Sequence, residues 1–372
     1  MLASTIWQLP LRQPWLYKGA KYEHFCGLTH TMRTPQVAPI QLHPTIPISY
    51  YNTPVYLCSP KWPEKSNSRL FLPQSGNEKH VCVTGGGSFS LILVKELLSR
   101  GYTVRLTVHS EGEMETMEKI EDLWSVEKLS AKMSDIESLC DAFQGCGAVF
   151  HTSSFIDPHG LSGYTERMAS LESKGAENVI KACAKARVNK CILTSSLLAC
   201  IWHSPTTATS TTTTTTIDES FWSDEALCRE NKLWLALGKT TAEQKAWRLA
   251  EERKVKMVSI LPGLIPPVSL HSNLATSVAY LKGGRHMLER GLLATIEVTK
   301  VAKAHVHIYE KMDYKAKGRF LCFDKVINQN EDILDLEKKF GMCGQLLGGT
   351  LPCEYYHPIL TNSKLLQLIP SM

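Results

Sequence analysis

Apolar and polar residues alternate with two different periods between residues 78 and 262. A short β-branched run, His80–Thr84, predicts a strand that ends in a glycine turn. Ser88–Arg100 follows with apolar residues on one helical face, and Gly101 ends it as a C-cap would. Later segments repeat this order, with strands expected at 103–108, 148–151, 190–194 and 256–261 and helices at about 168–186 and 232–253. The pattern predicts an α/β fold, a doubly wound parallel sheet with helices on both faces.

The two ends of the chain lack this alternation. Residues 263–372 carry shorter and less regular elements, which indicates a smaller C-terminal substrate lobe beside a nucleotide-binding domain at 78–262. Within that domain, residues 206–216 are almost all threonine and predict a surface loop. Residues 1–77 hold ten of the 18 prolines and no persistent period, so we expect a disordered extension that is dispensable for folding.

An organellar targeting role is the alternative for residues 1–77, because acidic residues are scarce there. Against it, serine is not enriched, proline is dense, and no apolar segment with a small-residue cleavage site is evident. Seven Lys or Arg residues and two acids fall in this segment, which accounts for the whole net charge of +5. The remainder is neutral, so we expect no nucleic-acid-binding face.

Cysteine usage and hydropathy bear on the location of the protein. The twelve cysteines are scattered without a Cys-x-x-Cys pair, and several lie in apolar strand-like runs. Such usage is typical of buried, reduced thiols, so we expect a cytoplasmic protein. No uninterrupted apolar run approaches the roughly 18 residues that a membrane span needs. The best stretch, Val258–Leu270, is interrupted by three prolines.

The glycine turn after the first strand has the geometry that binds a dinucleotide. Backbone N–H groups approach the pyrophosphate there, and the helix N-terminus adds partial positive charge. Gly85 fits the first glycine of the usual pattern, whereas Ser88 and Leu91 replace the second and third. Gly86 and Gly87 supply backbone freedom in their place. We therefore expect cofactor contacts from Gly85, Gly86, Gly87, Ser88 and Phe89; a tight turn without a ligand is the alternative.

Basic residues at the second strand are candidates for the 2′-phosphate of NADP. Arg105 lies within this strand and His109 just after it. A histidine is largely neutral at pH 7 and is a poor phosphate clamp. The alternative for Arg105 is a solvated charge on a strand. We expect weak binding of NADP, with NAD as the alternative cofactor and only slight discrimination between them.

Six ordered segments carry a resemblance to a known family: GYTVR at 101–105, GCGAVFHT at 145–152, LTSS at 193–196, DESFWSD at 218–224, GKTTAE at 238–243 and GRFLC at 318–322. Together they resemble the plant cinnamoyl-CoA reductases and dihydroflavonol reductases, which are extended short-chain dehydrogenases/reductases, from about His80 to Asp332. The resemblance implies an NAD(P)-binding Rossmann domain with a small C-terminal lobe. It also implies hydride transfer from NADPH to the carbonyl of a small molecule, such as a CoA thioester.

The family implies a catalytic set of Ser, Tyr and Lys, with Tyr and Lys four residues apart on a helix. Such residues share a face, so the ammonium lowers the phenol pKa from about 10, and it also holds the cofactor ribose. In this chain the serine falls on Ser196 and the lysine on Lys239. The tyrosine position falls on Leu235, which has no proton to give. Pro262 keeps the family's proline beside the cofactor.

Further departures from the family surround the expected cofactor site. His109 stands in place of an arginine, Lys132 in place of an acid that faces the adenine, and Leu261 in place of an asparagine. Two hypotheses follow. One is an NAD(P)-dependent oxidoreductase of phenylpropanoid-type carbonyl or CoA-thioester substrates with impaired catalysis. The other is a catalytically inactive nucleotide-binding relative that acts as a scaffold or regulator.

One histidine pair has the spacing of a possible metal site. His305 and His307 have no Cys or acidic ligands near them in the sequence, so we expect core or surface histidines and no metal. The oligomeric state is left open by the sequence.

Overall fold

The computed structural model describes residues 77–109, 114–115, 117, 124–154, 164–203, 216–267, 275–341 and 358–370. All of them fall in one compact unit, Arg69–Met372. The expected extension at 1–77 and the threonine-rich loop at 206–216 lie almost wholly outside these ranges. Among the described helices, none is long and apolar enough to cross a membrane.

Seven parallel strands form the main sheet, in the order β3-β2-β1-β4-β5-β7-β9. The strands are β1 (Asn77–Thr84), β2 (Thr103–Val108), β3 (Glu127–Ser130), β4 (Cys146–His151), β5 (Lys190–Thr194), β7 (Lys256–Pro262) and β9 (Gly318–Cys322). The strand order reverses between β1 and β4, and in such sheets ligands bind at this point, outside the carboxyl ends of the strands. The predicted α/β fold with a doubly wound parallel sheet is confirmed.

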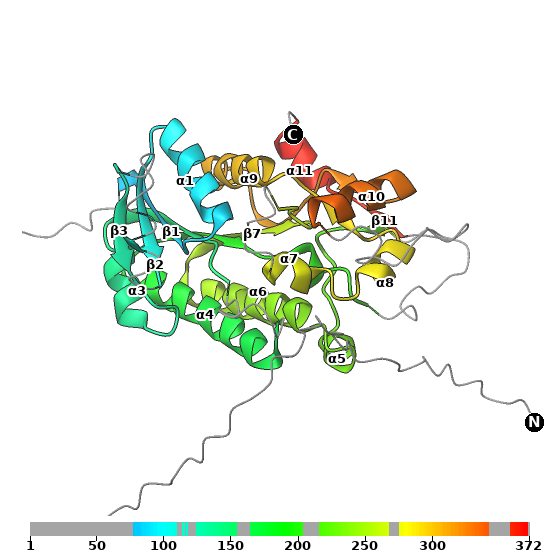
Figure 1. Cartoon of the computed structure of the whole chain (residues 1–372). Coiled ribbons are helices and arrows are strands. Elements are labelled where there is room, and N and C mark those ends of the chain that lie inside the picture. Colours follow the sequence, from blue (N-terminus) through cyan, green and yellow to red (C-terminus); the bar gives the residue numbers. More distant parts are fainter. Residues whose placement is uncertain are drawn as a thin grey trace, which may run out of the picture. The chain divides into compact units, whose positions relative to one another are not determined.

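Helices cover both faces of this sheet (Figure 1). On one face lie α1 (Ser88–Ser99) and α9 (Val298–Glu310), and on the other lie α3 (Ile136–Phe143), α4 (Glu166–Lys185) and α6 (Trp234–Arg253). Each face has its own buried hydrophobic cluster, and the strands contribute to both because their side chains alternate. The nearly continuous apolar runs of the sequence reflect this burial on two sides.

Local chemistry explains where these helices begin and end. Gly101 has a φ of 75° and donates to the Leu98 carbonyl, so it ends α1 as the sequence predicts. The Thr165 side chain accepts from the Met168 N–H and caps α4. The helix expected from residue 232 begins instead at Trp234, because Lys232 has a φ of 53°, in the left-handed region that a helix cannot include.

The C-terminal part contributes to the sheet as well as to a smaller cluster of short elements. β9 and α9 follow residue 262 yet belong to the sheet and one of its helical layers. The division into domains at 262 stays a prediction. The short elements are α5 (Glu225–Glu230), α7 (Ala275–Tyr280), α8 (Gly284–Glu289), α10 (Asn330–Lys339), α11 (Ser363–Leu368) and two small sheets, β8 (Ala294–Thr295) with β10 (Lys325–Val326) and β6 (Thr216–Ile217) with β11 (Ile359–Leu360).

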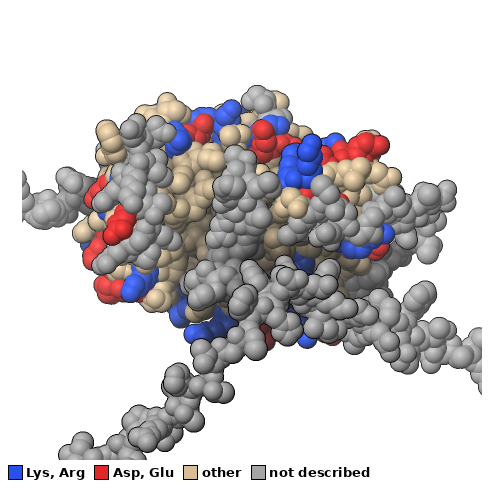
Figure 2. Space-filling view, in the orientation of Figure 1, with Lys and Arg blue, Asp and Glu red and all other residues tan. Residues whose placement is uncertain are grey.

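Charged side chains are mixed in sign on the face that Figure 2 shows. Lys and Arg residues lie among Asp and Glu residues there, and neither sign gathers into one large patch in the described part. The expectation of no nucleic-acid-binding face stays a prediction. The described cysteines are all free and buried, as expected for reduced thiols.

Candidate functional site

The turn between β1 and α1 is built around Gly85. Its φ is 93°, and its N–H donates to the Thr107 carbonyl of β2 at 3.1 Å. A Cβ on Gly85 would lie 2.7 Å from the Ser153 Oγ. Both the left-handed backbone and this close approach require glycine. The turn is therefore held between β2 and the segment that follows β4, at the switch point of the sheet.

The N-terminus of α1 leaves its first N–H groups directed out of the turn. Gly87 is the N-cap residue and offers no side-chain acceptor, and no acid lies in the first turn. Unsatisfied N–H groups and the helix dipole favour an anion at such a helix end. Leu91, in the third glycine position, packs partly buried against the hydrophobic cluster of this face. Phe89 contacts the His305 ring edge-on at 5.1 Å between centroids.

Ser153, in the segment that follows β4, lies against this turn, and the sequence did not point to it. The residue is 8% exposed, and its Oγ has no hydrogen-bond partner among the described residues. A buried hydroxyl without a partner is costly unless a ligand or water satisfies it. A hydroxyl donor beside the Gly85 turn and the α1 N-terminus fits a phosphate group. The residues present therefore fit the pyrophosphate of a dinucleotide.

The structure separates the two basic candidates of β2. The Arg105 guanidinium donates to Glu127 at 2.8 Å and to the carbonyls of Ala142 and Gln144. It thus pairs with β3 and satisfies carbonyls at the C-terminal end of α3. Arg105 is not brought to the glycine turn. His109 lies just past β2, at the carboxyl edge, with Nδ1 3.2 Å from the Ala131 carbonyl oxygen.

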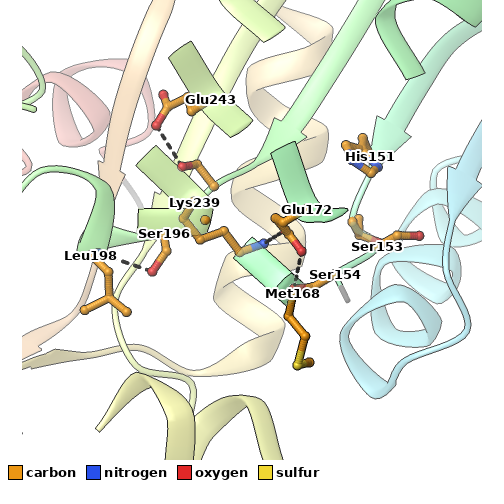
Figure 3. A network of polar contacts seen from close by, with 12 residues as sticks. His151, Ser153, Ser154, Met168, Glu172, Ser196, Leu198, Lys239 and Glu243 are labelled. Atoms are coloured by element: carbon orange, nitrogen blue, oxygen red, sulfur yellow. Dashed lines mark hydrogen bonds and ion pairs between the residues drawn. The ribbon is translucent and has the colours of Figure 1, made fainter. Parts of the chain in front are cut away.

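Ser196 and Pro262 lie at the same carboxyl edge of the sheet. Ser196 follows β5 and caps a short 3₁₀ turn at Leu197–Ala199, with its Oγ accepting from the Leu198 N–H at 3.2 Å. This bond leaves the Ser196 hydroxyl proton for another acceptor. Pro262 is the last residue of β7. α6 packs against the 3₁₀ turn, which brings Ser196 close to Lys239 (Figure 3).

The lysine of the expected catalytic set is already paired. Lys239 Nζ lies 2.6 Å from Glu172 Oε1, and the two residues are 9% and 6% exposed. Glu172 comes from α4, which lies alongside α6 (Figure 3). Leu235, one turn before Lys239, is buried in the hydrophobic cluster that the C-terminal elements share. An apolar side chain thus fills the place of the expected proton donor.

Two hydroxyls hold the second oxygen of the Glu172 carboxylate. Ser154 Oγ donates to Oε2 at 2.9 Å, and Tyr164 Oη donates to the same oxygen at 3.3 Å. Burial, and then the Glu172 charge, raise the pKa of Tyr164 well above its usual value. Tyr164 is therefore a poor replacement for the missing proton donor. We call Ser154, Tyr164, Glu172 and Lys239 the Glu172 network.

A buried histidine lies next to this network. Burial lowers the pKa of His151 to about 4; the Glu172 charge opposes that shift, and Lys239 adds to it. His151 Nδ1 and Thr84 Oγ1 share a hydrogen bond of 2.9 Å at the end of β1. His151 is thus neutral at pH 7. Of the pair that resembled a metal site, His305 is buried and His307 is half-buried beside Arg100.

A second buried carboxylate was also missed at the sequence level. Glu243 of α6 is fully buried and accepts from the Arg319 guanidinium at 2.8 and 3.2 Å and from Ser195 Oγ at 2.7 Å. Arg319 also donates to the carbonyls of Glu219 and Phe221, and its guanidinium stacks on the Trp222 ring at 3.6 Å. We call this set the Glu243 network. It joins β5, α6, β9 and the segment before α5.

One sequence signal could have revealed Glu172. It occupies the buried stripe of α4 at helical spacing, between Ala169 and Ala176. A charged residue on such a stripe requires a buried partner. Its partner could not be named without the structure, because Lys239 is 67 residues away in the sequence.

This sheet order, with a glycine turn and a helix N-terminus at the switch point, defines the class of Rossmann-type nucleotide-binding proteins. Solved structures with the same fold include vestitone reductase from alfalfa, with a TM-score of 0.58, 24% identity and coverage of 78% of this chain and 92% of that chain. A yeast methylglyoxal/isovaleraldehyde reductase complexed with NADPH has a TM-score of 0.60, 21% identity and coverage of 79% and 93%.

Sequence comparisons narrow this class. The 3-beta hydroxysteroid dehydrogenase/isomerase family model matches residues 82–222. Cinnamoyl-CoA reductase 1 of Petunia hybrida is 36% identical over 272 residues, which cover 70% of this chain and 77% of that protein. Cinnamoyl-CoA reductase 2 of Medicago truncatula is 33% identical over 276 residues, with coverage of 72% and 78%. The chain belongs to the cinnamoyl-CoA reductase-like family of extended short-chain dehydrogenases/reductases.

Proposed function

We propose that this chain is an NAD(P)-dependent oxidoreductase of the cinnamoyl-CoA reductase type with impaired catalysis. Its substrate class is a phenylpropanoid-type carbonyl compound or CoA thioester. The observation that carries the proposal is that Ser196 and Lys239 stand together while Leu235 fills the place of the proton donor.

The nucleotide end of the site supports binding of a nicotinamide cofactor. The Gly85 turn, the open N-terminus of α1 and the Ser153 hydroxyl offer donors for a pyrophosphate. Lys239 is the residue that would hold the ribose next to the nicotinamide. A reduced nicotinamide cofactor, when bound, would supply the hydride. His109 lies just past β2, where a 2′-phosphate would bind, and the Arg105 side chain of β2 is engaged by Glu127. We propose NADP as the cofactor, bound weakly and with little preference over NAD.

The substrate end explains the impaired catalysis. The Ser196 hydroxyl, whose proton is not used in its bond with the Leu198 N–H, would donate to a carbonyl oxygen, which orients a substrate and stabilises developing negative charge. No proton donor stands at residue 235, and a missing general acid costs on the order of 10² to 10⁴ in rate. The Lys239 ammonium, already neutralised by Glu172, stabilises such charge less. Slow turnover follows, with water as the proton source.

Turnover of the full chain tests this proposal. NADPH oxidation is followed with several hydroxycinnamoyl-CoA esters and a simple aldehyde, for wild type and Lys239→Ala. We expect slow wild-type turnover that Lys239→Ala removes. Fast turnover that survives Lys239→Ala would place the site elsewhere.

The second candidate function is a catalytically inactive nucleotide-binding relative that acts as a scaffold or regulator. Leu235 and the pairing of Lys239 with Glu172 both favour it. Saturable nucleotide binding without turnover of any carbonyl substrate distinguishes it from a slow enzyme. The cytoplasmic location expected from cysteine usage stays a prediction.

A further inference from the structure

The Glu172 network contains an ion pair at a place where the proposed function needs a free cation. A lysine ammonium that holds ribose hydroxyls must have N–H donors directed at them. One of the three N–H donors of Lys239 makes a short, charge-assisted bond to Glu172 inside the protein, which directs the ammonium toward α4. Resting on the proposed function, we propose that Glu172 is a positioning residue that competes with the nucleotide ribose for Lys239 and weakens cofactor binding.

The carboxylate is held in place independently of the lysine. Ser154 and Tyr164 both donate to Oε2, so Oε1 stays directed at Lys239. Gly238 allows this arrangement, because a Cβ there would lie 3.0 Å from Tyr164 Oη and 3.0 Å from the Ala169 Cα. The close approach of α4 and α6 therefore delivers both Tyr164 and Glu172 to the lysine. A carboxylate anchored in this way cannot follow the ammonium when it turns toward another acceptor.

The buried charges make this competition costly for the nucleotide. Separating two buried charges of opposite sign costs free energy, because each charge is then left in the protein without its partner. A nucleotide that recruits Lys239 has to weaken this pair, which lowers its affinity. The neutralised ammonium also lowers the pKa of any neighbouring phenol less than a free ammonium does. The single carboxylate thus affects both roles that the family assigns to its lysine.

The test replaces the charge and keeps the shape. In Glu172→Gln the amide still accepts from Ser154, while the charge on Lys239 loses its partner. NADPH is titrated calorimetrically into the full chain of wild type, Glu172→Gln and Glu166→Gln. Glu166 lies on the same helix, is exposed and pairs with Arg229, so it is the matched control. We expect NADPH to bind about tenfold more tightly to Glu172→Gln, and equally to wild type and Glu166→Gln.

Two further measurements separate this role from a structural one. Without nucleotide, Glu172→Gln should melt at a lower temperature than wild type, and saturating NADPH should raise its melting temperature more. In a Lys239→Met background, Glu172→Gln should leave the affinity unchanged, because no ammonium remains to compete for. If Glu172→Gln does not fold, Glu172→Asp keeps the charge, draws it back by one methylene and should give a smaller gain in affinity.

The outcomes distinguish this inference from the proposed function. If wild type binds NADPH saturably and Glu172→Gln binds it no more tightly, the role of Glu172 is overturned and the proposed function stands. The same affinity gain in the Lys239→Met background would also overturn the role of Glu172, because the effect would not pass through the lysine. If neither wild type nor any variant binds NADPH or NADH, the proposed function fails, and the competition fails with it.

Discussion

Two buried carboxylates on neighbouring helices have similar partners and different surroundings. Glu243 and Glu172 each accept from a serine and pair with a cation. The cation of Glu243 is Arg319, held by two bonds to the carboxylate, by backbone carbonyls and by Trp222. The cation of Glu172 is Lys239, whose ammonium donates to this carboxylate at 2.6 Å.

The number of partners around each buried cation distinguishes a structural ion pair from one that can take part in function. A planar guanidinium satisfied on all sides fixes four segments in one arrangement, and nothing is left for a ligand. An ammonium on a flexible stem can exchange one acceptor for another. The Glu243 network therefore holds these four segments together and has a structural role. The Glu172 network contains the charge for which, in our proposal, the nucleotide ribose competes.

The largest expected effect is on stability, at the Glu243 network. Arg319→Met leaves Glu243 charged, buried and unpaired, and should lower the free energy of unfolding by about 3 to 5 kcal/mol. Arg248→Gln, which removes an exposed i,i+4 pair with Glu252, should cost less than about 1 kcal/mol. Urea unfolding of both variants checks this. A loss of stability no larger for Arg319→Met than for the control would mean that this network does not have a structural role.

The next effect is on rate, at the Glu172 network. Leu235→Tyr places a phenol one turn before Lys239 on the same face. We expect NADPH oxidation with hydroxycinnamoyl-CoA esters to rise about 10²-fold, the lower end of what general acid catalysis supplies. The gain should be larger in Leu235→Tyr/Glu172→Gln, where the ammonium is free to lower the phenol pKa. No gain in either variant, despite measured cofactor binding, would favour the inactive scaffold or regulator.

A third effect is the dependence of stability on pH beside Glu172. Because burial depresses the pKa of His151 from 6.5 to about 4, the unfolded chain binds more protons between these values. The contribution of the neutral ring to the free energy of unfolding is complete above about pH 6.5 and is lost as the pH falls toward 4. At pH 5 the free energy of unfolding should be lower by about 2 kcal/mol from this cause. Unfolding free energies at pH 7 and pH 5 are compared for wild type and His151→Gln. An identical acid loss in both proteins would rule out His151 as its source.

The smallest effect concerns Ser153, which adjoins the Glu172 network through Ser154. Ser153→Ala removes a hydroxyl that has no partner among the described residues, and it should weaken NADPH binding about three- to tenfold. The melting temperature of the free protein should not fall, because the hydroxyl makes no hydrogen bond within the described part of the chain. Calorimetric titration and a thermal melt check the two statements. Unchanged affinity would place the pyrophosphate away from this hydroxyl.

The sequence predicted five of the seven strands, β1, β2, β4, β5 and β7, because their largely buried residues appear as apolar runs. It did not predict β3, whose residues are exposed or half-buried, or β9, which lies among the less regular elements that follow residue 262. It also located the Gly85 turn, since the chemistry of a left-handed turn needs glycine. The expected phosphate contact of Arg105 stays a prediction; in the structure its guanidinium donates to Glu127 on the adjacent strand and to two carbonyls.

The polar networks could not be predicted, because they join residues far apart in the chain. Glu172 reaches Lys239 across two packed helices, and Glu243 reaches Arg319 across 76 positions. The buried stripe of α4 marks Glu172 as a buried charge, but it does not identify the partner. Only the packing of α4 on α6 and of β9 on β7 decides which charges meet.

Nucleotide titration determines whether the Gly85 turn binds a nicotinamide nucleotide, as we propose for a site that has lost catalytic efficiency. NADPH and NADH are titrated calorimetrically into the full chain and into Gly85→Val, whose fold is checked by circular dichroism. We predict saturable, weak binding to wild type with slight preference for NADPH, and none to Gly85→Val, whose side chain would meet Ser153. Submicromolar NADPH binding with strong discrimination against NADH, or binding that survives Gly85→Val, would contradict this account.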